Sequence, residues 1–233
     1  MSAAFDLLRA RLPRHSPGRV FLAAECLLLF GVLPAGLIFL QLHGGLPFFP
    51  ILLGMTGLTF LLALFDPRIR FRQSTPPLRP HLKRILLRAA AAGLLLILLT
   101  LLMEPGLLFR LPRERTGLWL LILLLYPLLS VLPQHFIFRT FFLQRYPPLF
   151  GNGRGLIAAN ALLFSWAHAF FLNPLAPLLT LIAGLLFAGT WQQTRSLRLT
   201  CLEHALYGQL LFTSGLGWFF YNGSAQAVQT LID

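Results

Sequence analysis

The chain has 233 residues, of which 57% are hydrophobic and only 11% are charged, and its mean hydropathy is strongly positive. Soluble domains carry about 25% charged residues, so this composition excludes an ordinary soluble domain and indicates an integral membrane protein. The 19 Lys and Arg residues against seven Asp and Glu give a formal net charge of +12. Such an excess is typical of loops that flank membrane helices on the cytoplasmic side, so it indicates no nucleic-acid partner. Cys26 and Cys201 match no disulfide framework or metal-ligand spacing, and we expect them to be packing residues.

The N-terminal segment, residues 1–18, is basic and carries a short amphipathic patch. It contains Arg9, Arg11 and Arg14, and it has no apolar core followed by a small-residue cleavage site. We therefore expect a surface helix on the cytoplasmic face, ended by Pro13, and not a cleaved signal peptide.

Seven segments are apolar enough for membrane spans, each of which takes about 20 residues of helix. If the last one breaks near Ser214–Gly215, residues 216–230 form an eighth, short or re-entrant element. Lipid permits only helices and closed barrels, and no span has an alternating polar face, so we predict an all-α helical membrane bundle of seven or eight transmembrane helices. The seven predicted spans are residues 19–42, 46–65, 85–104, 117–144, 153–171, 174–192 and 198–221. We divide the chain into the basic N-terminus (1–18), N-terminal membrane helices (19–110) and a core of helices (117–221).

The loop charges predict an orientation. Sixteen of the 19 Lys and Arg residues fall on one side of the membrane, and Arg110, Arg113 and Arg115 fall on the other. The positive-inside rule then places the N-terminus in the cytoplasm. This distribution suits a bacterial inner (plasma) membrane.

Few ionisable residues lie inside the apolar segments: the acids Glu25 and Glu203, and the histidines His135, His168 and His204. An ionisable group near the bilayer centre costs roughly 2.5–3.5 kcal/mol, and such groups usually face a protein interior or a wet cavity. At 1.5 Å per helical residue, the depths of the three histidines agree within about 10 Å. A single polar site is therefore possible, although each histidine can also be an ordinary hydrogen-bonded core residue.

Three histidines in one polar site indicate metal binding. Catalytic zinc is commonly held by three protein ligands with a fourth position open. We predict that His135, His168 and His204 bind a divalent metal ion, with zinc as the best fit, and that Glu203 is the general base for a bound water. Adjacent helical positions point about 100° apart, so Glu203 can instead face a neighbouring helix. Glu25 is the second candidate base, and its alternative role is an ion pair with Arg139 or with an arginine at the cytoplasmic flank.

Three segments resemble the motifs of the CAAX protease and bacteriocin-processing family, which includes type II prenyl-protein endopeptidases and bacterial Abi proteins. They are QHFIFR at 134–139, FSWAH at 164–168 and HALYG at 204–208. The family motifs are Glu-Glu-x-x-x-Arg, Phe-x-x-x-His and His-x-x-x-Asn on successive core helices. Their order and spacing of roughly 35 residues match, and the resemblance covers about residues 117–221.

The resemblance implies an intramembrane peptidase in which Glu activates water and His residues, with a divalent metal, support attack on a membrane-associated peptide or protein. The chain departs from the family at three positions. Gln134 and His135 occupy the positions of the two Glu residues, and Gly208 occupies the position of the final Asn. It retains Arg139, Phe164, His168 and His204. The implied catalytic group is therefore Gln134 and Arg139, together with Glu203.

The remaining site candidates have alternative roles. Phe164, Trp166 and Tyr207 can line a substrate cleft, although Phe164 can also be core packing and aromatic residues such as Trp166 and Tyr207 gather at membrane interfaces. Arg139 is either an anchor at the cytoplasmic end of its helix or a fork that orients Gln134, a carboxylate or the substrate.

Two other functions remain open. The loss of both Glu residues favours a catalytically inactive family member that binds a membrane partner. Intramembrane His and Glu residues are also found in small transporters and proton relays, but the sequence has none of the repeated halves that transporters show.

Overall fold

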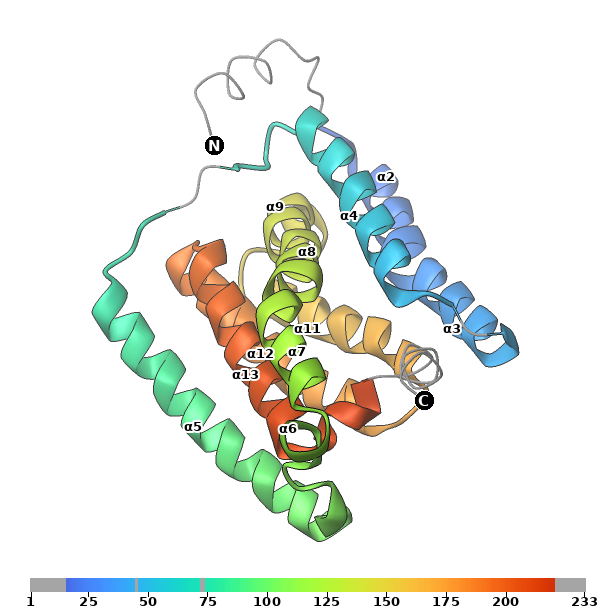
Figure 1. Ribbon diagram of the computed structural model, residues 1–233. Coiled ribbons are helices and arrows are strands. Elements are labelled where there is room, and N and C mark those ends of the chain that lie inside the picture. Colours follow the sequence, from blue (N-terminus) through green and yellow to red (C-terminus); the bar gives the residue numbers. More distant parts are fainter. Residues whose placement is uncertain (1–15, 45, 72–73, 221–233) are drawn as a thin grey trace.

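The computed structural model describes residues 16–44, 46–71 and 74–220 of the chain (Figure 1). Every regular element among them is helical, which confirms the all-α fold class. The predicted surface helix within 1–18 lies outside the described residues except for its last three positions. The predicted element at 216–230 is described only as far as Phe220, where Leu216–Phe220 forms a short 3₁₀ helix.

Five stretches within these described ranges are long and apolar enough to cross a membrane, judged by length and composition. The two remaining predicted spans are also helical but fall short: α11 (Arg154–His168) has 15 residues, and α13 (Leu197–Ser214) contains several polar side chains. The predicted count of seven or eight spans is therefore not confirmed. The five stretches are Arg19–Gly44, Phe48–Phe65, Leu78–Met103, Thr116–Arg145 and Leu175–Thr194.

Large apolar side chains are exposed along these helices. Leu94 and Leu102 on α5 (Leu78–Met103) leave 71% and 73% of their surface exposed, and Leu124 on α7 (Thr116–Tyr126) leaves 67% exposed. A soluble protein avoids large exposed apolar patches, whereas lipid accommodates them. The protein is an integral membrane protein.

The helices form a central group flanked on two sides. The α2–α3 and α4 hairpin lies on one side of α7–α13, and α5 lies on the other (Figure 1). Helix α11 packs against α12, and α5 packs along α13. The helices are, in chain order, α2 (Arg19–Cys26), α3 (Leu33–Gly44), α4 (Phe48–Phe65), α5 (Leu78–Met103), α6 (Arg110–Glu114), α7 (Thr116–Tyr126), α8 (Leu132–His135), α9 (Leu143–Arg145), α10 (Pro147–Phe150), α11 (Arg154–His168), α12 (Leu175–Thr194) and α13 (Leu197–Ser214).

Wide π-helical turns interrupt two of the long spans. One joins α2 to α3 at Leu27–Val32, and two others, Pro127–Val131 and Phe136–Phe142, lie on either side of α8. Proline has no N–H to donate within a helix, so Pro127 and Pro133 favour such irregular turns here. Turns of this kind are frequent at functional sites.

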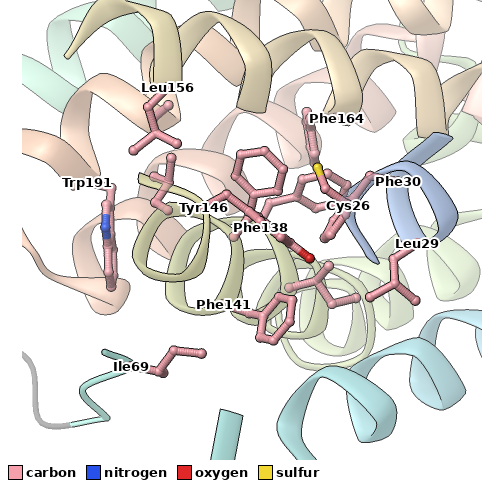
Figure 2. Close-up of a cluster of buried hydrophobic side chains, with 14 of the residues drawn as sticks. Cys26, Leu29, Phe30, Ile69, Phe138, Phe141, Tyr146, Leu156, Phe164 and Trp191 are labelled. Carbon is pink, nitrogen blue, oxygen red and sulfur yellow. The ribbon is translucent and has the colours of Figure 1, made fainter. Parts of the chain in front are cut away.

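An aromatic core joins the N-terminal hairpin to the central group (Figure 2). The ring of Phe30 meets the rings of Phe138, Phe142 and Tyr146 edge to face, with centroids 5.4, 5.0 and 5.8 Å apart. Such pairs contribute about 0.5–1.5 kcal/mol each beyond the area that they bury. The core therefore fixes residues 138–146 against the π-helical turn Leu27–Val32 that follows α2.

A buried ion network, which we call the Arg145 clasp, ties the same elements together. Arg145 donates from Nε and Nη2 to both carboxylate oxygens of Glu25, at 2.6 Å each, and from Nη1 to Asp66 at 2.6 Å. Tyr146 also donates to Glu25, and Arg68 donates to Asp66 from the outer side. Glu25 thus has the alternative role predicted for it, an ion pair with an arginine.

We predict that the clasp loses strength in acid. Burial alone would raise the pKa of Asp66, but hydrogen bonds from Arg68 and the charges of Arg68 and Arg145 lower it below its ordinary value. Because its pKa is lowered on folding, ionised Asp66 stabilises the folded state, and this stabilisation is complete above the unfolded-state pKa of about 4. The stabilisation is lost as the pH falls through the folded-state pKa. Thermal unfolding in detergent across a pH series should show this loss.

The variant Asp66→Asn should flatten that acid dependence. Glu114→Gln is the control, because the Glu114–Arg110 ion pair is exposed and should leave the slope unchanged. An Asp66→Asn protein with the acid slope of the wild type would contradict the prediction.

Candidate functional site

Three polar side chains lie one helical turn apart on α7, α8 and the π-helical turn between them. Tyr126, Ser130 and Gln134 are spaced by four residues, so they share a face. The Gln134 amide donates from Nε2 to the Ser130 hydroxyl at 2.8 Å. Its other atom, Oε1, is buried and has no hydrogen-bond partner among the described residues. Gln134 therefore offers a free acceptor.

A hydrogen-bonded chain of Tyr126, His204 and His135 lies beside this face. Nε2 of His204 is 2.9 Å from the Tyr126 hydroxyl, and its Nδ1 is 2.9 Å from Nε2 of His135. The His135 side chain is buried, and its Nδ1 has no partner in the described part of the chain. The ring of Phe187 stacks on His204 with centroids 4.8 Å apart. We refer to these three residues as the Tyr–His–His chain.

His168 is fixed by the residue one turn before it. Its Nδ1 lies 2.7 Å from the Phe164 carbonyl oxygen, and its ring contacts the Phe164 ring with centroids 4.5 Å apart. A carbonyl oxygen only accepts, so Nδ1 carries the proton and Nε2 of the neutral ring carries the lone pair. The Phe164 ring also meets His204, with centroids 6.0 Å apart. His168 and His204 thus both contact Phe164, and His135 joins this group through its contact with His204.

A cavity of about 400 Å³ opens beside these groups. Apolar side chains from α5, α7, α11, α12 and α13 form most of its wall, and none of the described residues that line it is an Asp, Glu, Lys or Arg. Apolar sites with a few polar groups are typical of pockets for small or extended ligands. The polar side chains of the wall are Tyr126, Ser130, Gln134, His168, Thr180, His204 and Tyr207.

Arg139 lies behind the wall. It is completely buried, so it does not reach a lipid headgroup. It donates from Nη1 to Asn160, and its guanidinium group lies over the rings of Phe164 and Phe187, 5.2 and 5.8 Å from their centroids. Its Nε and Nη2 have no partner within the described ranges. Arg139 therefore supports the ring that positions His168.

Glu203 points to a different helix from its neighbour His204. Its Oε1 accepts hydrogen bonds from Arg88 of α5 at 3.2 Å and from the Tyr207 hydroxyl at 3.0 Å. Glu203 does not line the cavity but faces the neighbouring helix α5, which is the alternative that the helical angle allowed.

Two of the three predicted cleft residues lie on the cavity wall. Phe164 and Tyr207 line the cavity. Trp166 does not: 41% of its surface is exposed, and its indole donates to the carbonyl of Gly31 in the first π-helical turn, at 3.1 Å.

The donor arrangement does not fit the predicted zinc centre. One ring nitrogen of His135 is hydrogen-bonded to one ring nitrogen of His204, and the second nitrogen of His204 is hydrogen-bonded to Tyr126. Within the part of the chain that the structure describes, no group of three or more His, Cys, Asp or Glu side chains is placed to hold a metal ion. Metal binding by these histidines would require the contact between His135 and His204 to open.

Gly208 leaves room for Tyr126. A Cβ at this position would overlap the Tyr126 ring and hydroxyl. Tyr126 was not predicted from the sequence, although its spacing of four and eight residues from Ser130 and Gln134 was a usable signal. Arg88 and Asn160 were not predicted either, because their roles depend on contacts with distant helices.

Residues 115–210 match the family model described as Type II CAAX prenyl endopeptidase Rce1-like. This part of the chain is similar to the type II CAAX prenyl endopeptidases. The match confirms the resemblance seen in the three motifs, and it runs from the start of α7 into α13, so it contains the Tyr–His–His chain and His168. The helices before Arg115 lie outside it. No curated protein and no solved structure matches the chain.

Proposed function

We propose that the protein is an intramembrane endopeptidase that cleaves an apolar peptide segment within or beside the bilayer. The observation that carries the proposal is His168, whose unprotonated Nε2 belongs to a ring that lines the apolar cavity. The match to a family of prenyl endopeptidases supports the same reaction class.

In the proposed reaction, His168 is the general base. Its Nε2 accepts a proton from water as the water oxygen attacks the peptide carbonyl carbon. The protonated ring then returns this proton to the amide nitrogen, the C–N bond breaks, and a carboxylic acid and an amine are formed. The Gln134 carboxamide oxygen, which is free, accepts the second water hydrogen and so orients the attack.

In this mechanism, His168 takes the proton-accepting role that a glutamate has in the family. Gln134 stands at the position of the first family Glu and cannot accept a proton, so the proton acceptor must be another group. Glu203, the base predicted from the sequence, would have to leave Arg88 and Tyr207 to serve. His168 needs no such rearrangement.

We expect metal removal to leave cleavage unchanged, because the proposed base is an imidazole and His135 and His204 are bonded to each other. Metal content per chain should be measured for the wild type, His168→Ala and His204→Ala, with activity before and after chelation. Near-stoichiometric metal that is lost in both variants would contradict this expectation and support the zinc hypothesis instead.

The test of the proposed function is cleavage in water enriched in ¹⁸O. The wild-type protein in lipid nanodiscs would be incubated with apolar helical peptides, and products identified by mass spectrometry. We expect one new C-terminus that carries ¹⁸O. His168→Asn, purified in the same way, controls for contaminating proteases. Binding of the peptides without any cleavage would overturn the proposal.

A second candidate is an inactive family member that binds a membrane protein or peptide. It is favoured by the lack of carboxylates among the described residues of the cavity wall. A proton relay is less well supported, because the Tyr–His–His chain ends at His135 Nδ1, which has no partner among the described residues.

For the membrane topology, we propose that α11 and α13 complete seven spans with the five longer helices. The asymmetry of loop charges supports a cytoplasmic N-terminus and a bacterial inner membrane.

A further inference from the structure

We infer that Tyr126 supplies the hydrogen bond that stabilises the negative oxygen formed when water attacks the substrate carbonyl. This inference rests on the proposed peptidase function and names a residue that neither the sequence motifs nor the family match assigns.

Tyr126 is held at the polar end of the cavity from three sides. Its hydroxyl is 2.9 Å from Nε2 of His204, and its ring meets Phe212 edge to face with centroids 5.5 Å apart. Gly208 provides the space in which the ring lies. The residue is a wall residue of the cavity, as are His168 and Gln134. A bound peptide would therefore meet the Tyr126 hydroxyl and the proposed base in the same cavity.

The unpartnered nitrogen of His135 decides which way the protons point. If Tyr126 donated to His204 and His204 donated to His135, a proton would be left on His135 Nδ1, where no acceptor lies within the described residues. The opposite direction leaves an unpaired lone pair on His135 Nδ1. Among buried backbone groups an unpaired acceptor is less rare than an unpaired donor, and the same preference favours this direction.

In the favoured direction, His135 donates from Nε2 to His204, and His204 donates from Nε2 to the Tyr126 oxygen. The Tyr126 proton is then not used within the chain and is available to a ligand in the cavity. Accepting a hydrogen bond also polarises the hydroxyl and makes it a stronger donor.

A donor at this place matches the charge that develops in peptide hydrolysis. The carbonyl oxygen becomes negative as the water oxygen bonds to the carbon, and it returns to a carbonyl when the C–N bond breaks. Tyr126 keeps its proton throughout and contributes only the hydrogen bond. Donors of this kind typically contribute roughly 10²- to 10³-fold to the rate.

The test compares two peptides that differ at one bond. One is an apolar peptide, and the other carries an uncleavable phosphinate in place of the scissile amide, so that it presents a tetrahedral, negatively charged oxygen. We expect wild-type protein in nanodiscs to bind the phosphinate more tightly. Tyr126→Phe should weaken phosphinate binding roughly 10- to 100-fold, as expected for one hydrogen bond to a charged group, and leave binding of the plain peptide unchanged.

Tyr146→Phe is the matched control. Tyr146 is buried away from the cavity wall and its hydroxyl donates to Glu25, so loss of this hydroxyl should leave phosphinate affinity unchanged. Gly208→Ala should reproduce the effect of Tyr126→Phe without altering the tyrosine, because the added Cβ displaces the ring.

The outcomes separate the two claims. Tight phosphinate binding by wild type that survives in Tyr126→Phe, or an equal loss in Tyr146→Phe, would overturn the role of Tyr126 and leave the peptidase proposal standing. A wild-type protein that binds the phosphinate no more tightly than the plain peptide would overturn the peptidase proposal and this inference with it.

Discussion

Replacing His168 with Asn should lower the rate of peptide cleavage roughly 10²- to 10⁴-fold, which is the usual contribution of a positioned general base. Asn is smaller than His and keeps an N–H group that can reach the Phe164 carbonyl, so the turn that ends α11 should persist. What is lost is the lone pair of Nε2, the proposed proton acceptor. Initial rates with the ¹⁸O assay would measure the change, together with the unfolding temperature of each protein.

His43→Asn is the control for this variant. His43 makes the same local contact with Phe39, with Nδ1 2.7 Å from its carbonyl oxygen and the two rings 4.3 Å apart. It lies on α3 and does not line the cavity. We expect it to cleave at the wild-type rate. Full activity in His168→Asn, or an equal loss in His43→Asn, would contradict the assignment of the base.

Replacing Arg145 with Met should destabilise the folded protein by roughly 3–5 kcal/mol, the usual effect of removing one partner from a buried ion pair. The Arg145 and Glu25 side chains are only 4% and 8% exposed, and the Asp66 side chain is fully buried. Met fills much of the space of Arg145 but leaves both carboxylates without this partner. Unfolding in detergent, followed by loss of helical signal, would measure the effect.

Arg68→Met is the control that removes a positive charge from Asp66 but leaves the hydrogen bonds of Arg145 in place. Arg68 binds Asp66 from a position where 23% of its side chain is exposed, so its removal should cost much less than that of Arg145. Adding Glu25→Gln to Arg145→Met should recover part of the lost stability, because one unpaired buried charge is removed. Equal effects of Arg145→Met and Arg68→Met would show that the clasp is not the main tie between these helices.

The fold class followed from the sequence because hydropathy and helix length act locally. The number of spans did not, since α11 ends at His168 after 15 residues and its length depends on the turn that follows. The π-helical turns beside α8 were also not predicted, although Pro127 and Pro133 mark their positions.

The sequence allowed us to predict that the histidines lie together, but not which side chains each of them contacts. The three histidines do form one connected group, because His168 and His204 contact Phe164 and His135 contacts His204. A spacing of four residues between Phe and His cannot identify the site, however, because Phe39 and His43 share it and form the same contact away from the cavity. The orientation of Glu203 depended on Arg88, which is 115 residues away in the chain.

The Arg145 clasp also bears on how the chain is made. Glu25 lies in the first described helix, and the arginine that binds it is 120 residues later. At a synthesis rate of about 5–20 residues per second, the ribosome needs roughly 6–24 s to reach that arginine. Until then Glu25 has no Arg145 to bind, and an unpaired ionised acid in lipid is costly. Full stabilisation of the N-terminal hairpin therefore has to wait until Arg145 has been made.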